Sequence, residues 1–286
     1  MKIKVITDTA ADLPLNVLKD NDITVVPLVV SFEDKVLRLG KDISYEDYYE
    51  LLDSLDTIPN TAAPDPASFY EEFKDSIEKQ GYDFIFCVTV GNELSATYSS
   101  AMIAAKKMED NVHILNSASA SGVEGLIALN IVELANKGKS VDEIKRLVNI
   151  MKEESHLCAG FHTLENIYKF GRLKSKFILN ATKFIRIKPI IVLEEKGDLQ
   201  SKLPGFFFEK HMLRRLINTT LKKVNRNLVF DMVISHISNE SGAEKLKHKI
   251  KKKLKIRKEY VTIATPLVGT HTGKRTLILS LVPVLE

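Results

Sequence analysis

The chain has 286 residues, of which 44% are hydrophobic and 27% charged, and its formal net charge is +4 at pH 7. This length and composition are typical of a globular protein of one or two domains and exclude an intrinsically disordered chain. No stretch approaches the roughly 18 apolar residues of a membrane span, and the first residues lack the apolar core of a signal peptide, so we expect a cytoplasmic protein.

Strand-like and helical segments alternate through the first half of the chain. Apolar runs predict strands at residues 2–6, 23–32, 84–90 and 112–115. Helical spacing of apolar residues predicts helices at 44–55, 69–80, 97–108, 122–136 and 140–154. Such alternation favours a parallel sheet covered by helices on both faces, whose ligands bind beyond the carboxyl ends of the strands.

Local signals refine this first half. Pro27 indicates an edge or a bulge in the second strand, and the two prolines that flank Asp65 predict a turn at residues 61–66. Asp12 is a candidate cap for a short helix, and Ser44 begins the next one. A capping box at residues 140–143 begins the last helix of this half.

The strand at 84–90 is the most informative single stretch. A glycine ends it, and Ser95 and Thr97 begin the following helix. Hydroxyl groups and the free N–H groups of a helix start would then meet at the carboxyl end of a buried strand, where they can bind a small anion. The alternative is that Ser95 is only a helix cap.

The pattern changes near residue 156. Strands are predicted at 156–163, 228–237, 260–264 and 275–284, a hairpin at 188–203, and helices at 164–172 and 206–224. Few parallel crossovers are needed here, which favours an α+β domain with a mixed sheet. We therefore predict an amino-terminal α/β domain of three α/β/α layers at residues 1–160, a carboxy-terminal domain at 161–286, and a ligand between them.

The positive charge is concentrated in one segment. Lys245 to Lys258 holds nine Lys or Arg and no acidic residue, and Ala243, Leu246, Ile250 and Leu254 recur in it at helical spacing. This predicts an amphipathic helix whose cationic face is solvated or meets an acidic partner or an anionic membrane. We do not expect nucleic-acid binding, because no aromatic residue is interleaved with these charges.

Cysteine usage argues against metal or disulfide chemistry. Cys87 and Cys158 lie in apolar strand-like runs without a CxxC spacing. We expect both to be small core residues and expect no metal site and no cofactor.

Six short motifs together resemble the DegV family of bacterial fatty-acid-binding proteins. In chain order they are TDTAADLP, TAAP at residue 61, LSATY, TLENIYKFGRL, IKPII and GTHTG. The resemblance spans almost the whole chain. It implies a two-domain DegV-like fold with a long-chain fatty acid buried between the domains. It also implies a protein without activity of its own, which presents the fatty-acid carboxyl group to a separate kinase.

The resemblance also assigns roles to residues. The two carboxyl-binding hydroxyl groups of the family fall on Thr61 and Ser95, and Arg172, Thr270 and His271 fall near the head group, where they could receive a phosphate. Hydroxyl donors can hold a carboxylate without a salt bridge. The plain alternatives are a turn hydroxyl for Thr61 and a loop histidine for His271.

The chain departs from the family pattern at four places. Ala96 replaces a glycine of LSGTY, and the residues before Arg172 and after Gly273 differ. Alanine at position 96 requires a negative φ. The family's arginine after the hairpin is absent, and Lys202 is the nearest cation there. Lys274 and Arg275 could take its place in docking a kinase.

Two other functions remain open. A serine hydrolase or acyltransferase could use Ser95 with His271, although the chain has no GxSxG elbow and no evident acidic partner for the histidine. A regulatory protein could bind a membrane or a partner through the basic segment.

Overall fold

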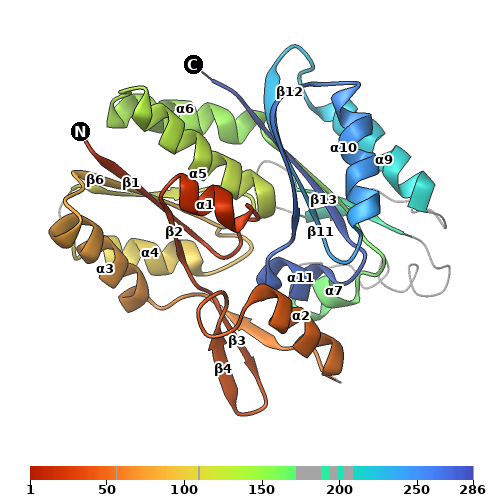
Figure 1. Cartoon of the computed structure of the whole chain (residues 1–286), viewed down its shortest axis with the longest axis horizontal. Coiled ribbons are helices and arrows are strands. Elements are labelled where there is room, and N and C mark those ends of the chain that lie inside the picture. The colour runs from red at the N-terminus through yellow and green to blue at the C-terminus, as the bar shows by residue number, and fades with distance from the viewer. Residues whose placement is uncertain (56, 109, 172–187, 194–198, 202–208, 286) are drawn as a thin grey trace.

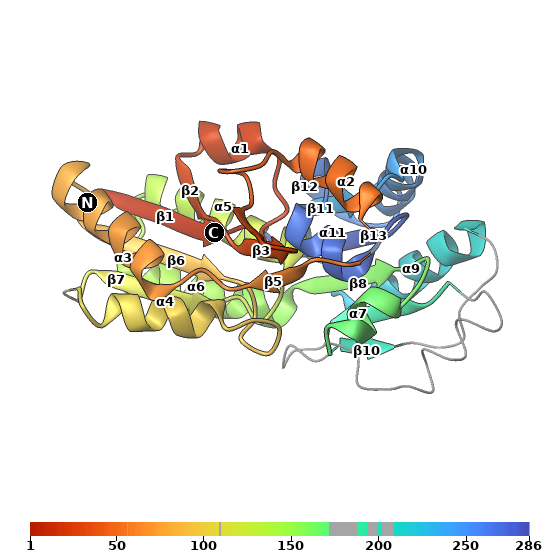
Figure 2. The same ribbon diagram turned by 90° about the horizontal axis from the view of Figure 1, so that it is seen from below.

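A computed structural model describes residues 1–55, 57–108, 110–171, 188–193, 199–201 and 209–285 of the chain. In this part the chain forms two large sheets and one small sheet. The two large sheets lie at opposite ends of the molecule with helix α5 between them, as both views show (Figures 1 and 2).

The first large sheet has four strands that are all parallel. In spatial order they are β2 (Ile23–Val26), β1 (Ile3–Asp8), β6 (Phe84–Thr89) and β7 (Val112–Asn116). On one face α3 (Pro66–Lys74) and α4 (Thr97–Ala105) bury two phenylalanines, Phe69 and Phe73, against the strands. Helix α5 (Ser121–Asn136) covers the other face. The predicted three layers and parallel sheet are confirmed.

The second large sheet has six strands and is mixed. In spatial order they are β10 (Leu199–Ser201), β9 (Ile190–Leu193), β8 (His156–Gly160), β13 (Leu277–Pro283), β11 (Val229–His236) and β12 (Lys255–Ile263). Within this sheet, β11 and β12 pair in parallel, and the other described pairs are antiparallel. Helices α9 (Glu209–Lys223) and α10 (Glu240–Lys251) cover one face, and α5 and α6 (Val141–Glu154) cover part of the other. The predicted mixed sheet is confirmed.

Helix α5 joins the two sheets into one apolar core. Twelve of its residues are buried, because it packs against the four-stranded sheet on one side and the six-stranded sheet on the other. A glycine is required at position 122, where an added Cβ would lie 2.4 Å from the Cβ of Val233. The division into domains near residue 160 stays a prediction, since residues of both halves contribute to this core.

The third sheet is small, antiparallel and absent from the expectations. Its strands are β4 (Lys35–Arg38), β3 (Val29–Phe32) and β5 (Asn60–Ala62). The single strand predicted at 23–32 is wrong, because Pro27 lacks the N–H needed to continue the ladder and the chain changes sheets there. The turn predicted at 61–66 is also wrong at its start, since Thr61 pairs with Val30 in β5.

Helix starts agree with the expectations in two cases and differ in two. Ser44 caps α2 (Tyr45–Ser54), and both bonds of the capping box at α6 are present. The short helix α1 (Leu15–Asp20) has no side-chain cap, because the Asp12 carboxylate is used elsewhere. Helix α4 begins at Thr97, as predicted, but Ala96 and not Ser95 occupies the cap position.

The basic segment is divided between two elements, so the single helix predicted there is wrong. Helix α10 ends at Lys251, and the rest continues into β12, whose charged side chains suit a sheet edge. The apolar side chains Ala243, Leu246 and Ile250 are buried against the six-stranded sheet. The first four residues of the GTHTG motif lie in a helix that was not predicted, α11 (Pro266–Thr272), and Gly273 follows it as the cap.

The remaining elements in the described residues are short. They are the π-helix η1 (Asp75–Lys79) and α7 (Glu165–Lys169). Both cysteines are buried free thiols, as expected. In the described part of the chain, none of the helices combines the length and apolar character that crossing a bilayer requires.

Candidate functional site

A cavity of about 280 Å³ lies where residues of both halves of the chain meet. Its lining is mostly apolar and comes from the loops after β1 and β6, from β5 and α11, and from one face of β8, β9 and β13. Among the described lining residues the polar ones are Thr61, Ser95, Ser121, His271 and Thr272. The cavity therefore suits a mostly apolar ligand that carries a polar group.

Thr61 and His271 both line the cavity and contact each other. The Thr61 Oγ1 lies 3.0 Å from the His271 Nε2, although 210 positions separate the two residues. The Phe170 ring meets the His271 ring edge-on, with the ring centroids 4.3 Å apart. When the His271 Nε2 carries the proton it donates to the Thr61 Oγ1, and the Thr61 hydroxyl hydrogen is then available to a ligand.

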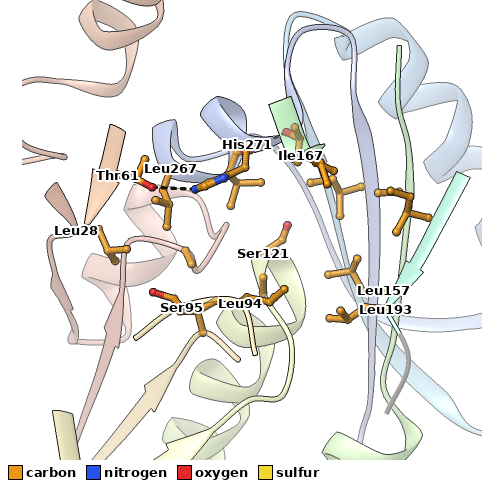
Figure 3. Close-up of a pocket in the computed structure, with 18 of the residues that line it drawn as sticks. Leu28, Thr61, Leu94, Ser95, Ser121, Leu157, Ile167, Leu193, Leu267 and His271 are labelled. Atoms are coloured by element: carbon orange, nitrogen blue, oxygen red, sulfur yellow. Dashed lines mark hydrogen bonds between the residues drawn. The ribbon is translucent and has the colours of Figure 1, made fainter. Parts of the chain in front are cut away.

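Ser95 lies on the same side of the cavity as Thr61 (Figure 3). Its loop begins at Gly91, where two backbone segments approach closely: an added Cβ would lie 3.1 Å from the backbone of Ala118 and of Ser119. The Ser95 Oγ lies 2.8 Å from the Thr97 Oγ1 and accepts a bond from the Thr97 N–H at 3.4 Å. Since Ser95 can act as acceptor in both contacts, its own hydrogen can be donated to a ligand.

Thr61 and Ser95 thus each bring a hydroxyl group to a mostly apolar cavity, and His271 contacts Thr61. A protein-family model described as "Uncharacterised protein, DegV family" matches residues 2–284. The chain belongs to the DegV family.

Several DegV relatives are similar over nearly their whole length. A "DegV domain-containing protein" of Caldanaerobacter subterraneus is 27% identical, covering 95% of each chain. A "Fatty acid-binding protein" of Thermotoga maritima is 24% identical, covering 97% of this chain and 96% of the relative. A solved structure described as "Fatty Acid Binding of a DegV family Protein from Thermus thermophilus" has a TM-score of 0.90 and 20% identity, covering 99% of this chain and 100% of that one.

Not all of the other residues assigned from the DegV family line the cavity. The Thr270 hydroxyl donates to the Pro266 carbonyl at 2.7 Å and accepts from the Tyr48 hydroxyl at 2.5 Å, and this buried side chain does not line the cavity. Arg172 and Lys202 lie outside the described residues. Lys274 pairs with Asp53 at 2.5 Å.

The departure from the DegV pattern at position 96 is resolved by the backbone. Ala96 has φ −74°, which any residue adopts, so alanine in place of glycine causes no strain there. Ala96 also lines the cavity. The loop shape that presents Ser95 is therefore compatible with alanine.

A buried carboxylate that the sequence analysis placed in a helix cap supports this site. Asp12 accepts from the Thr265 N–H at 2.7 Å and from the Ser121 hydroxyl at 2.5 Å. Thr265 immediately precedes α11, and Ser121 lines the cavity with a backbone φ of 56°. Asp12 thus ties the helix that carries His271 to the loop after β1.

Further contacts fix the position of α11. The Tyr49 hydroxyl donates to the Ala264 carbonyl at 2.8 Å, and the neighbouring Tyr48 bonds Thr270 from the same helix, α2. The signal available in the sequence was the acidic residue after the first strand, but only the fold shows its partner 253 positions away.

The wild type should lose stability as the pH rises, because Asp12 then ionises while it is buried, and Asp12→Asn should remove this loss. Burial raises the pKa of Asp12 from 3.8 to about 6, so the folded state disfavours the ionised carboxylate. The free energy of unfolding of the wild type should therefore fall as the pH rises from about 4 to about 6 and stay lower above it, by about 2 to 3 kcal/mol. The Asn side chain can still accept from the Thr265 N–H. Urea unfolding across this range gives the difference.

The titration of Asp8 does not affect the difference in stability between the wild type and Asp12→Asn. Burial also raises its pKa to about 6, but Asp8 is present in both proteins and its contribution cancels. Equal slopes of stability against pH in the wild type and Asp12→Asn would contradict the prediction.

Proposed function

We propose that this DegV protein binds one long-chain fatty acid in the cavity, with the carboxyl group at Thr61 and Ser95 and the acyl chain along the six-stranded sheet. The observation that carries the proposal is an apolar cavity with two hydroxyl donors gathered on one side of it. The fatty-acid-binding names of the Thermotoga maritima and Thermus thermophilus relatives support it.

The acyl chain supplies most of the affinity. Burial of about 14 to 16 methylenes at about 0.8 kcal/mol each gives a gross gain of about 11 to 13 kcal/mol. Hydrogen bonds to a charged head group add about 1 to 3 kcal/mol. The apolar walls therefore retain the ligand, and Thr61 and Ser95 orient it.

Mass spectrometry of lipid extracted from the purified protein tests this function. A ligand enclosed by apolar walls dissociates slowly, so we expect a long-chain fatty acid to be recovered in an amount comparable to that of the protein. Protein purified without lipid that also binds no added fatty acid would refute the proposal.

Thr61→Val and Ser95→Ala should disturb the head group more than retention of the lipid. Each variant removes one hydroxyl donor, so the dissociation constant should rise by about five- to tenfold, while fatty acid still co-purifies. The carboxyl resonance of a fatty acid labelled with ¹³C at that carbon should shift in both variants. Thr61→Ser, which keeps the hydroxyl, is the matched control. Complete loss of lipid from a folded variant would be inconsistent with this division of roles.

We also propose that the protein has no catalysis of its own, needs no cofactor, and presents the carboxyl group to a separate kinase. The hydrolase alternative needs a histidine to activate Ser95. In the part of the chain that is described, the Ser95 hydroxyl bonds Thr97, and the His271 Nε2 bonds Thr61. A fluorophosphonate probe separates the two functions, since labelling of Ser95 would favour the hydrolase.

Attraction to an anionic membrane is a second candidate. Lys245, Lys249, Lys252, Lys253 and Lys255 are exposed and form no ion pair with the described residues. Because the apolar side of α10 is buried, this attraction would be electrostatic, at about 1 kcal/mol per cation near the surface. Salt-sensitive pelleting with vesicles, lost when Lys249, Lys252 and Lys253 are neutralised, tests it.

A further inference from the structure

The floor of the cavity is one face of the six-stranded sheet. Helices α5 and α6 cover this face over β11 and β13, and the cavity lies over its continuation on β8 and β9. Side chains alternate between the two faces of a strand, so residues 157, 159 and 161 of the chain face the cavity together. Cys158, between them, points into the apolar layer under α9.

Strand pairing orders these floor residues in two rows. In the first row Ala159 is opposite Ile191 on one side and Ile278 on the other. In the second row Leu157 is directly opposite Leu193. Directly opposite residues have Cβ atoms about 5 Å apart, and successive rows on one face are about 6.5 Å apart. The small Ala159 leaves room above the first row, whereas two leucines stand side by side in the second.

A second and more polar cavity of about 400 Å³ begins at the same two leucines. Leu157 and Leu193 line both cavities, and the second is also lined by Lys152, Glu153 and His156. Figure 3 shows Leu157 and Leu193 on the opposite side of the apolar cavity from Thr61 and Ser95. The leucine pair is therefore the partition between an apolar space and a polar one.

We propose that Leu157 and Leu193 form an end wall that sets the longest acyl chain this protein holds. The inference rests on the proposed function and adds to it which residues select chain length. Carbons that reach the wall are buried against leucine, while carbons beyond it would enter a space lined by charged side chains and gain nothing from the transfer. Affinity should rise with chain length and then stop rising at the wall.

The test uses dissociation constants of the delipidated full chain for saturated fatty acids from 12 to 22 carbons. Each buried methylene strengthens binding by about fourfold. In the wild type the affinity should rise with each added carbon up to a limiting chain length and stay constant beyond it. Leu157→Ala and Leu193→Ala should each move that limit up by about two carbons, so that a chain two carbons longer than the wild-type limit binds about 15-fold more tightly than it does to the wild type.

Two further variants make the test specific. Leu193→Phe adds bulk at the wall and should move the limit to shorter chains, which a general loss of packing would not do. Ile190→Ala truncates a neighbouring residue of β9 whose side chain packs in the apolar layer with α9, and it should leave the limit unchanged.

The outcomes distinguish the two proposals. Fatty-acid binding by the wild type, with the same limit in all wall variants, overturns the end wall alone. A wild type that binds no fatty acid of any length overturns the proposed function and the end wall with it. Opposite shifts in the alanine and phenylalanine variants support the wall.

Discussion

Ala159→Phe should abolish tight fatty-acid binding and leave the protein folded. Ala159 lies in the middle of the cavity floor, between Ile191 and Ile278, and its Cβ faces the empty space. A phenyl ring there would take the place of about five methylenes of the acyl chain. At about 0.8 kcal/mol each, the loss is about 4 kcal/mol, which is nearly a thousandfold in the dissociation constant.

The ring enters a cavity and does not press on packed atoms, so stability should be kept. The melting temperature of the delipidated variant should equal or exceed that of the delipidated wild type, since new contacts form across the void. Titration with a 16-carbon fatty acid measures the affinity. Ala67→Phe, at an exposed position of α3 away from the cavity, is the matched control and should bind normally. Normal affinity in Ala159→Phe would mean that the acyl chain lies elsewhere.

Gly122→Ala should greatly lower the stability of the protein, and by more than Gly125→Ala on the same helix. The added Cβ would lie 2.4 Å from the Cβ of Val233 and 2.8 Å from the Cβ of Ser280, on two neighbouring strands of the six-stranded sheet. Neither atom can rotate away, because a Cβ is fixed by its backbone. The helix must move from the sheet, at a cost of about 3 kcal/mol.

Gly125→Ala, one turn further along the same helix, is the control. Its added Cβ would meet the Leu13 side chain, 2.6 Å from Cγ, and this side chain can shift its rotamer. Alanine is favoured over glycine in a helix by about 1 kcal/mol, which offsets much of that strain. Urea unfolding should therefore show a clear loss for Gly122→Ala and a small change for Gly125→Ala. Similar losses in both variants would mean that α5 does not approach the sheet this closely.

Gly122→Ala should also weaken ligand binding. Ser121, the preceding residue, lines the cavity and bonds Asp12, so movement of the start of α5 changes one wall. The same close packing that stabilises the core thus also shapes the site.

Elements with a regular local pattern were predictable. The apolar run at 84–90 became β6, and the capping box at Ser140 began α6, because both features depend on residues near in sequence. The prediction failed at Pro27, where a single strand became two strands of different sheets, and in the basic segment, where charge without tertiary context favoured one long helix. In both cases the choice depended on which partner strand was available, and no local spacing encodes that.

The candidate site was predictable only in part. Ser95 came from the strand–glycine–helix pattern as well as from family resemblance, Thr61 from resemblance, and both line the cavity. Thr270 was assigned with them but bonds Tyr48, while Ser121 and the structural role of Asp12 were missed. The contacts that decide these roles join residues 109 to 253 positions apart. Hydrogen bonds over such separations leave no periodic signal.

The sequence by itself determined the class of the fold, the family, and the burial of both cysteines, because hydrophobic periodicity and short motifs are properties of neighbouring residues. The tertiary structure decided where the cavity lies and which side chains line it. Strand register places Ala159 in the floor and brings Leu157 opposite Leu193, and the packing of α11 brings His271 to Thr61. Cavity shape depends on which side chains face one another across elements, and that information exists only once the chain has folded.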